Sequence, residues 1–378
     1  MRIGGSGLGV GPGNGCSHHG RTVFRGRPGG GAVRHLAIRA PNWVGDLVMA
    51  TPILRAALAD ERFGRVSVVV RSHLREVLSG GVIEGCSIGV GDGRSERRVL
   101  EELSPNAILL LSNSFGAAWR AWRTGIPVRA GAALSGRRAL LTHAVLPPAR
   151  DGRRVPIPTA HLLRDVAGLF GIRVPDLHPR LDCDAATETR AAERLKQQGA
   201  DPRAPYVLCC PGAAFGAAKL WPAQHFAQVL DGLFESRGWR GVVTGGPGEE
   251  ALVRSVAGAT RTGAAALVGD RDGLGMLKAW VRGARLLLVG DSGPRWYAAA
   301  FDVPCVTVMG PNFPELTASS LDLCEVARVE ELECAPCLER RCPLGHHRCM
   351  RELAPASVLR AVDRVLARAS KLGAEVPA

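Results

Sequence analysis

The chain has little of what marks several large classes of protein. No apolar run approaches the ~20 residues that a membrane-spanning helix needs, so we expect no transmembrane segment. It contains no P-loop and no complete GxGxxG motif, so the common phosphate-binding fingerprints are missing. Tyrosine occurs only twice, and no basic run is interleaved with aromatic residues, which disfavours a nucleic-acid-binding surface. Only four of the 48 basic residues are lysines, so each lysine stands out.

What is present is a long chain with enough apolar residues for two cores. At 378 residues, 46% of them hydrophobic, it exceeds the size of one ordinary domain. The net charge of +13 points to anionic partners such as phosphates, acidic lipid or nucleic acid, although a GC-rich coding sequence explains most of the preference for arginine. The eleven cysteines are unevenly placed, which favours a reducing cytoplasm over a secreted disulfide framework.

The first 33 residues are rich in glycine and arginine. They lack the apolar stretch of a signal peptide, so we do not expect secretion. The prediction for residues 1–33 is a disordered tail, with a mis-assigned start codon as the alternative.

Residues 34–184 are predicted to form an N-terminal domain in which strands alternate with helices, as in a parallel sheet with crossover helices. Three buried strands are predicted at 35–41, 65–70 and 106–114. The helix after the first strand begins near Asp46 and contains Pro52, so a kink is expected. An amphipathic helix at 159–172 closes this half.

The same alternation restarts after a charged linker. Residues 185–203 are predicted to be the linker with one helix, and residues 204–355 a second parallel-sheet domain. Residues 356–378 add an amphipathic helix and a tail. The expected fold class is therefore α/β, with two Rossmann-like domains facing each other across a cleft. Ligands are expected at the carboxyl ends of the strands.

One turn at such a strand end carries Asp46, a single carboxylate in the otherwise apolar stretch PNWVGDLVMATPIL at 41–54. Two interpretations are open. An acid is favoured in the first turn of a helix by the dipole and the free N–H groups. Alternatively, Asp46 is the general base of an enzyme.

Two further turns combine small residues with polar groups. The loop that contains Gly212 and Ala213 leads to Lys219, which is either a clamp for a diphosphate or an exposed lysine at a helix start. The turn Asp291-Ser292-Gly293 offers a hydroxyl and N–H donors to the same phosphates, or simply caps a helix.

Five stretches resemble the successive blocks of glycosyltransferase family 9, in the order of its ADP-heptose:lipopolysaccharide heptosyltransferase II members. They are APNWVGDLVMATPILRAAL, CPGAAFGAAKLWPAQHFAQV, GGPGEE, GDSGPRWYAAAFDVPCVTVMGPN and CAPCLERRCPLGHHRCM, spread between residues 35 and about 365. The first, second and cysteine-rich blocks are specific, whereas GGPGEE alone would mean little. The resemblance implies a GT-B fold, an acceptor bound mainly by the N-terminal domain, an ADP-sugar bound by the C-terminal domain, and inverting transfer.

The resemblance also implies roles for individual residues. Asp46 would take the acceptor's hydroxyl proton as that oxygen attacks from the face opposite the departing ADP. Lys219 would neutralise charge on ADP, and Glu249 would hold the ribose or adenine. The remaining residues expected around the diphosphate are Gly212, Ala213, Asp291, Ser292 and Gly293.

One block departs from the family pattern. The family usually has histidine after the arginine of this block, and here Trp296 follows Arg295. If that histidine assists the leaving group or the acceptor, this protein either manages without it or uses Arg295. The sugar specificity is open on the same ground.

A cysteine cluster with the spacing C-x2-C-x4-C-x6-C is formed by Cys334, Cys337, Cys342 and Cys349. This spacing suits a structural zinc ion, but reduced thiols packed in a loop are the favoured alternative. Catalysis is expected to need no metal. Asp182-Cys183-Asp184 looks like a metal-binding DxD motif, but it falls in the linker and is attributed to chance.

The expected function is transfer of L-glycero-D-manno-heptose from ADP-heptose to heptose I of the lipopolysaccharide inner core. A family relative with another nucleotide sugar, or with a protein or glycan acceptor, is one alternative. A basic nucleic-acid-binding protein with a Cys knuckle is the other. The expected partners are ADP-heptose and the lipid A-core acceptor at the membrane surface, with no nucleic acid. The protein is expected to be a cytoplasmic monomer, with peripheral attachment to the inner membrane left open.

Overall fold

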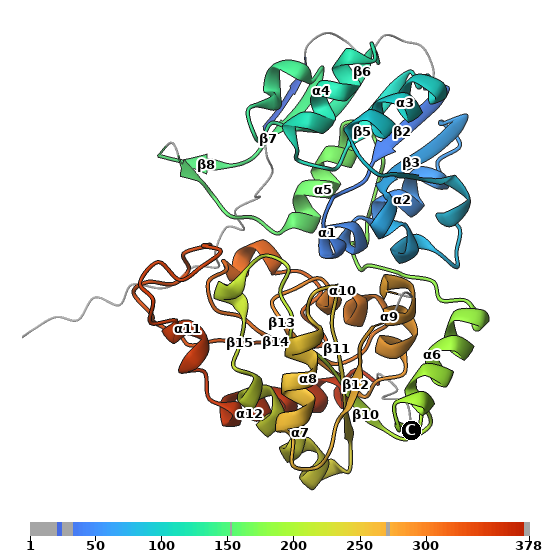
Figure 1. Ribbon diagram of the computed structural model, residues 1–378. Helices are drawn as coiled ribbons and strands as arrows, with labels where there is room; N and C mark the ends of the chain where they lie inside the picture. Colours follow the sequence, from blue (N-terminus) through green and yellow to red (C-terminus); the bar gives the residue numbers. More distant parts are fainter. Residues whose placement is uncertain (1–20, 25–32, 152, 270–272, 374–378) are drawn as a thin grey trace, which may run out of the picture.

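The computed structural model describes residues 21–24, 33–151, 153–269 and 273–373. Two α/β units lie one above the other, the N-terminal one in blue to green and the C-terminal one in yellow to red (Figure 1). Each is built around its own mainly parallel sheet, and a two-stranded hairpin of β8 (Ala149–Arg150) and β9 (Arg153–Arg154) projects from the first.

The N-terminal sheet has seven strands in the order β1-β7-β6-β5-β2-β3-β4. Their bounds are Arg21–Phe24 (β1), His35–Arg39 (β2), Arg65–Arg71 (β3), Ser87–Val90 (β4), Ala107–Leu110 (β5), Val128–Ala132 (β6) and His143–Leu146 (β7). Every neighbouring pair is parallel except β1 with β7. The side chains of the central strand β5 are all buried, as expected for a parallel sheet covered on both faces.

The helix predicted after the first strand is divided in two, as Pro52 indicated. α1 (Val44–Met49) and α2 (Thr51–Leu58) are separated at Ala50, and the proline stands at the beginning of α2. A proline is tolerated in the first turn because its missing N–H would have no partner there. The other helices of this unit are η1 (Ser72–Leu78), η2 (Glu84–Cys86), α3 (Gly93–Leu103), α4 (Phe115–Arg123), η3 (Arg137–Leu140) and α5 (Thr159–Gly168).

The C-terminal sheet repeats the strand order of the first unit and is parallel throughout its described part. Its order is β12-β11-β10-β13-β14-β15. The bounds are Tyr206–Cys210 (β10), Arg240–Thr244 (β11), Ala265–Leu267 (β12), Leu286–Gly290 (β13), Cys305–Val308 (β14) and Cys324–Ala327 (β15). In both sheets the chain order reverses beside the first buried strand. Ligands of doubly wound sheets bind at this reversal.

The second unit includes two helices that the sequence analysis assigned to separate segments, one in the linker 185–203 and one at 356–378. The helices of this unit are α6 (Ala185–Gln197), η4 (Ala217–Lys219), α7 (Ala223–Arg237), α8 (Glu250–Ala259), α9 (Gly273–Arg282), α10 (Pro294–Ala300), η5 (Pro314–Thr317), α11 (Arg348–Arg351) and α12 (Pro355–Lys371). The predicted linker helix α6 packs on α9, and the Trp280 indole donates to the carbonyl of Ala191. The C-terminal helix α12 packs on α7 and β15. Both helices cover apolar surface of the second unit and belong to it.

Two local predictions are also corrected. Within the predicted disordered tail, Arg21–Phe24 forms the strand β1, which pairs with the free edge of β7. The sequence RTVF suits a strand, because β-branched and aromatic residues favour extended backbone. Residues 1–20 and 25–32 of the tail lie outside the described residues. The helical pattern after β3 forms η1, a 3-10 helix, instead of an α-helix.

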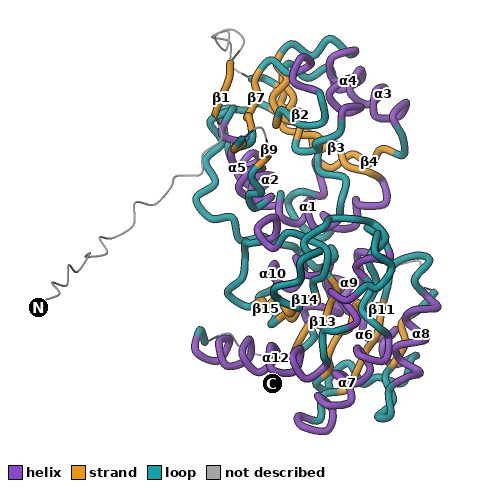
Figure 2. Tube along the Cα trace, turned by 90° about the vertical axis from the view of Figure 1, so that its left-hand side faces the viewer, coloured by secondary structure: helices purple, strands orange, loops and turns teal. Residues whose placement is uncertain are grey.

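The two units are in contact along one face. α1 packs on α10, and η1 packs on α9 (Figures 1 and 2). The ammonium of Lys278 donates to the carbonyl of Ser79 at 2.6 Å and to its hydroxyl at 2.9 Å, which ties α9 to the end of η1. Among the helices of the described residues, none has the length and apolarity to cross a membrane.

Candidate active site

Asp46 lies in the first turn of α1, the helix that packs on α10 of the second unit. It is partly exposed between the buried residues Gly45 and Leu47. Its burial raises the pKa of the carboxyl to about 6. No described residue forms a hydrogen bond or ion pair with its side chain, and Trp43 at the N-cap contributes no side-chain bond either. The carboxylate makes no capping hydrogen bond, and without a partner it is available to accept a proton. Its place in the first turn also suits the helix dipole, so both interpretations stay open.

The turn before Asp46 touches the turn after β13 across the two units. A Cβ atom on Gly45 would lie 2.6 Å from Cδ1 of Trp296, and one on Gly293 would lie 2.8 Å from Cβ of Val44. Real Cβ atoms do not come this close to other atoms, so glycine at both positions is what permits the contact. The contact brings the predicted base and the predicted diphosphate turn, two segments far apart in sequence, to one place.

Gly45→Ala is therefore expected to lower kcat by roughly tenfold or more while the protein stays folded, because the added methyl group pushes Trp296 and the facing turn away from Asp46. Steady-state kinetics and thermal melting of the variant check this. Gly258→Ala on α8 is a matched control, since a Cβ atom there meets nothing within 4 Å. Equal kcat for Gly45→Ala and the parent would show that the contact is not needed.

Lys219 is buried at the end of η4 and forms an ion pair with Asp291. Its Nζ lies 2.6 Å from Oδ2 of Asp291 and 4.7 Å from the ring centre of Phe215. The amide of Asn312 donates to the same Oδ2 at 2.8 Å. Asp291 thus holds the ammonium in place. The prediction that the turn Asp291-Ser292-Gly293 offers a hydroxyl and N–H donors to the diphosphate stays a prediction.

The other predicted donor-side residues lie near one another. A Cβ atom on Gly212 would meet Oε2 of Glu249 at 2.0 Å, so the acid lies directly on the glycine after β10. The same oxygen accepts from the N–H of Gly246 at 2.7 Å. A Cβ atom on Gly290 would lie 3.5 Å from the carbonyl oxygen of Gly212. The turns after β10, β11 and β13 therefore meet, with Ala213, Ser292 and Gly293 half-buried beside them.

The cysteine-rich segment lies against the Lys219 turn. The carbonyl of Arg340 accepts from the N–H of Ala218 at 3.1 Å, and Nε2 of His347 lies 2.7 Å from the carbonyl oxygen of Ala218. A Cβ atom on Gly216 would meet the Arg340 oxygen at 2.5 Å. The segment thus supports the turn that presents the ammonium, a role that its sequence did not indicate.

The four clustered thiols show no metal-binding arrangement. Burial, followed by the neighbouring Cys337, Cys334 and Cys342, raises the pKa of Cys349 to about 11, so the thiols are close enough to influence one another. In the described part of the chain, no three His, Cys, Asp or Glu side chains are placed to hold a metal ion. The zinc interpretation gains nothing from this geometry and stays a prediction.

The residues of the DxD-like motif have structural contacts. Asp182 forms an ion pair with Arg55 of α2. The side chain of Asp184 caps α6 by accepting from the N–H of Thr187 at 2.8 Å. These contacts agree with the interpretation of Asp182-Cys183-Asp184 as a chance match.

Arg295, which precedes the tryptophan in the histidine position, is buried and has polar partners in the second unit. Its Nε donates to Sγ of Cys324 at 3.3 Å, and its Nη2 donates to the carbonyl of Ser319 at 3.1 Å. The guanidinium also lies over the Trp296 ring, 4.5 Å from the ring centre, and the same ring contacts Gly45. Both alternatives raised by the sequence, a site without this group and a site that uses Arg295, stay predictions.

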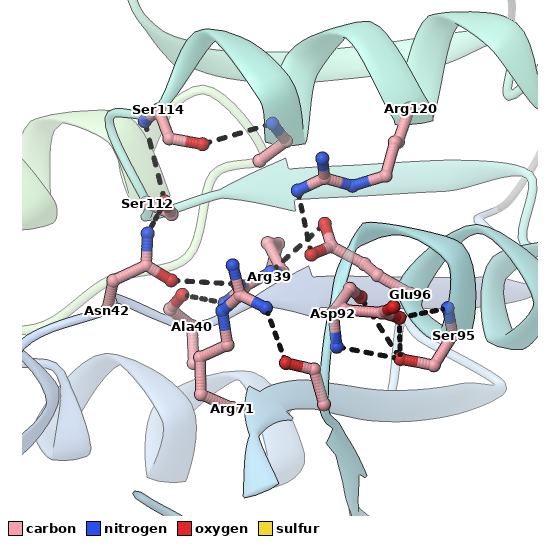
Figure 3. Close-up of polar contacts among 12 residues, drawn as sticks. Arg39, Ala40, Asn42, Arg71, Asp92, Ser95, Glu96, Ser112, Ser114 and Arg120 are labelled. Atoms are coloured by element: carbon pink, nitrogen blue, oxygen red, sulfur yellow. Dashed lines mark hydrogen bonds and ion pairs between the residues drawn. The ribbon is translucent and has the colours of Figure 1, made fainter. Parts of the chain in front are cut away.

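A buried polar network beneath the Asp46 turn was missed by the sequence analysis. Arg39 at the end of β2 pairs with Glu96 at 3.2 Å and donates to Oδ1 of Asn42 at 2.8 Å (Figure 3). Asn42 in turn donates to the hydroxyl of Ser112 at 3.0 Å, and Arg120 pairs with Glu96 at 2.9 Å. Arginine and glutamate are rarely fully buried unless paired, and only the fold brings these partners together. The network fixes the segment that leads into α1.

Comparison with known proteins now decides the family. The profile of glycosyltransferase family 9 (heptosyltransferase) matches residues 94–348. The chain belongs to glycosyltransferase family 9. It is a glycosyltransferase with the GT-B fold, so the predicted fold class is confirmed.

Relatives within family 9 are similar to this chain over nearly its whole length. Lipopolysaccharide heptosyltransferase 2 of Escherichia coli (strain K12) is 26% identical over 354 residues, which are 88% of this chain and 98% of the relative. The protein of the same name from Salmonella typhimurium is 25% identical over 349 residues, again 88% and 98%.

Two solved structures of the family share the fold. The E. coli ADP-heptose lps heptosyltransferase II gives a TM-score of 0.70 at 24% identity, covering 89% of this chain and 99% of that one. A glycosyl transferase family 9 protein from Veillonella parvula gives a TM-score of 0.72 at 19% identity, covering 88% and 97%.

Proposed function

We propose that this protein transfers L-glycero-D-manno-heptose from ADP-heptose to heptose I of the lipopolysaccharide inner core. Relatives that match 88% of its length are named lipopolysaccharide heptosyltransferase 2, and this supports both donor and acceptor. Because the chain belongs to glycosyltransferase family 9, we propose an enzyme and set the nucleic-acid-binding alternative aside. The alternative of another nucleotide sugar or another acceptor is left to the assay below.

The observation that carries the proposal is the contact between the Asp46 turn and the Gly293 turn. It sets Val44 and Gly45, which directly precede the unpartnered carboxylate of Asp46, against the turn of the second unit whose Asp291 pairs with Lys219. An acceptor entering from the N-terminal side would then meet the base, while the departing diphosphate would meet the ammonium and the N–H groups of the Ser292-Gly293 turn before α10.

The proposed chemistry is a single displacement with inversion. Asp46 accepts the proton of the acceptor hydroxyl as its oxygen forms a bond to the anomeric carbon. The bond from that carbon to the diphosphate breaks on the opposite face, and its electron pair leaves with ADP. Lys219 stabilises the charge that develops on the leaving phosphate. No step requires a metal ion.

The pKa of Asp46 predicts a pH dependence. A general base works only when ionised, and burial raises this pKa from 3.8 to about 6. We therefore expect kcat to increase as the pH rises through about 6 and to level off above it. Measuring kcat at saturating substrates between about pH 5 and pH 8 checks this. A kcat that stays constant down to about pH 5 would argue against Asp46 as the base.

Activity is expected to survive EDTA at ordinary temperature, because Lys219 and backbone N–H groups can hold the diphosphate without a metal. Metal analysis of the purified protein and a melting curve with chelator test the separate zinc interpretation of the cysteine segment. Immediate loss of transfer under EDTA that zinc restores, with the fold intact, would make a metal part of the active site.

The reaction is proposed to take place in the cytoplasm, at the inner membrane, with a monomeric enzyme. The assay combines the protein with ADP-heptose and a core lipid that ends in heptose I, and measures ADP release together with the mass of the product lipid. Release of ADP that depends on this acceptor supports the proposal. Transfer from a different nucleotide sugar, with none from ADP-heptose, would replace it by the alternative.

A further inference from the structure

Helix α4 exposes three large aromatic side chains on one face. Phe115, Trp119 and Trp122 are 48%, 43% and 44% exposed, and we call them the α4 ridge. Their spacing of four and three residues places them on one side of the helix. The rings of Phe115 and Trp119 stack at 6.2 Å, and those of Trp119 and Trp122 lie 4.9 Å apart. A continuous exposed apolar strip of this kind marks an interaction surface, unlike single exposed apolar residues.

Basic side chains flank the α4 ridge. Helix α3 packs beside α4 (Figure 1). Arg123 is exposed in the last turn of α4, and Arg94 and Arg98 are exposed on α3. No acidic partner among the described residues pairs with any of these three arginines. Tryptophan beside arginine is typical of protein segments that lie in the headgroup region of a membrane, where the rings enter the interface and the cations meet anionic lipid.

The helix that bears the ridge is attached to the catalytic turn. On its inner side Arg120 pairs with Glu96, and Glu96 pairs with Arg39, which bonds Asn42 just before α1 (Figure 3). The N-cap of α4, Ser114, follows Ser112, whose hydroxyl accepts from Asn42. The ridge therefore begins at the same edge of the sheet as the Asp46 turn, and its orientation is fixed relative to that turn.

We propose that the α4 ridge docks this enzyme on an anionic lipid bilayer and thereby presents the Asp46 turn to a membrane-embedded acceptor. The proposal rests on the proposed function for the nature of the acceptor, but the docking itself does not depend on it. A second copy of this chain is the other partner that such a strip could bind, and the light-scattering experiment below distinguishes it from a bilayer.

The test compares the parent with Trp119→Ser/Trp122→Ser, both exposed sites outside the catalytic machinery. Vesicles of phosphatidylethanolamine with about 30% phosphatidylglycerol are used beside vesicles of phosphatidylcholine alone, and bound protein is measured by co-sedimentation. Phe234→Ser, a 39% exposed aromatic on α7 of the other unit, is the matched control. Thermal melting confirms that all variants are folded.

We expect the parent and Phe234→Ser to bind the anionic vesicles and to bind them less at high salt, and the double variant to bind them roughly tenfold more weakly or worse. Equal binding of the double variant would overturn the proposal, and so would equal binding of the parent to both kinds of vesicle. A parent that is dimeric in light scattering, with a monomeric double variant, would assign the ridge to a second copy.

The activity arms separate this proposal from the proposed function. With a deacylated, soluble heptose-I acceptor the double variant should turn over like the parent, and with acceptor lipid in anionic vesicles its rate should fall by roughly tenfold. An equal loss on both acceptors would show that the ridge acts on the active site instead of on the membrane. Vesicle binding without transfer to either acceptor would reject the proposed function and leave the docking in place.

Discussion

Asp46→Asn is expected to lower kcat by roughly 10²-fold or more while the affinity for ADP stays within about twofold of the parent's. The amide has almost the same shape as the carboxylate but cannot accept the acceptor's proton. The native carboxylate has no hydrogen-bond or ion-pair partner in the described structure, so the exchange breaks no contact there. The fold should therefore survive, which separates chemistry from stability.

The measurement is steady-state turnover with calorimetry of ADP binding on the same preparations. Glu61→Gln is the matched control, because Glu61 is an exposed acid in the same unit without a recorded partner. It should behave like the parent in both experiments. Near-normal turnover of Asp46→Asn would remove Asp46 from the mechanism and restore the interpretation of an acid favoured by the helix dipole.

Lys219→Ala is expected to weaken ADP binding by roughly tenfold or more, since a charge-assisted contact to a phosphate typically contributes about 1.5–3 kcal/mol. The single change also leaves Asp291 buried without its cation, which is destabilising. The double variant Lys219→Ala/Asp291→Asn removes that unpaired charge. Its ADP affinity should be as low as that of the single variant, but its melting temperature should be closer to the parent's.

Lys196→Ala serves as the control for this series, because Lys196 is exposed on α6, away from the predicted site. Calorimetry with ADP gives the affinities, and thermal melting gives the stabilities. Unchanged ADP affinity of a folded Lys219→Ala variant would contradict the clamp. Recovery of affinity in the double variant would show that Asp291, rather than the lost ammonium, causes the defect.

The sequence predicted the elements whose patterns are local. The run HLAIR before a turn, the alternation after residue 204 and the proline at position 52 correspond to β2, the second sheet and the break between α1 and α2. Short strands such as β12 and β15 were not predicted, because three or four residues give little periodicity. The packing of α6 on α9 includes the hydrogen bond from the Trp280 indole to the carbonyl of Ala191, 89 residues earlier. No local sequence pattern predicts such a distant contact.

The site was predictable where a motif carries it and hidden where partners are distant. Asp46, Lys219 and Gly293 were predicted from the turns that contain them, and their roles stay predictions. The turns of Gly45 and Gly293 touch, and this contact requires glycine at both positions. Neither turn alone could have predicted it. The pairing of Asp291 with Lys219, and of Glu96 with Arg39 and Arg120, likewise joins residues separated by 24 to 72 positions.

A single turnover with known stereochemistry tests the central claim most directly. The protein, in excess over ADP-heptose, is mixed with a soluble heptose-I acceptor, the reaction is quenched, and the anomeric configuration of the new linkage is determined by NMR. A base at Asp46 that works in one displacement predicts one inverted linkage for each ADP released in the parent, and almost none in Asp46→Asn. Retention of configuration in the product, or an undiminished turnover in Asp46→Asn, would contradict the account.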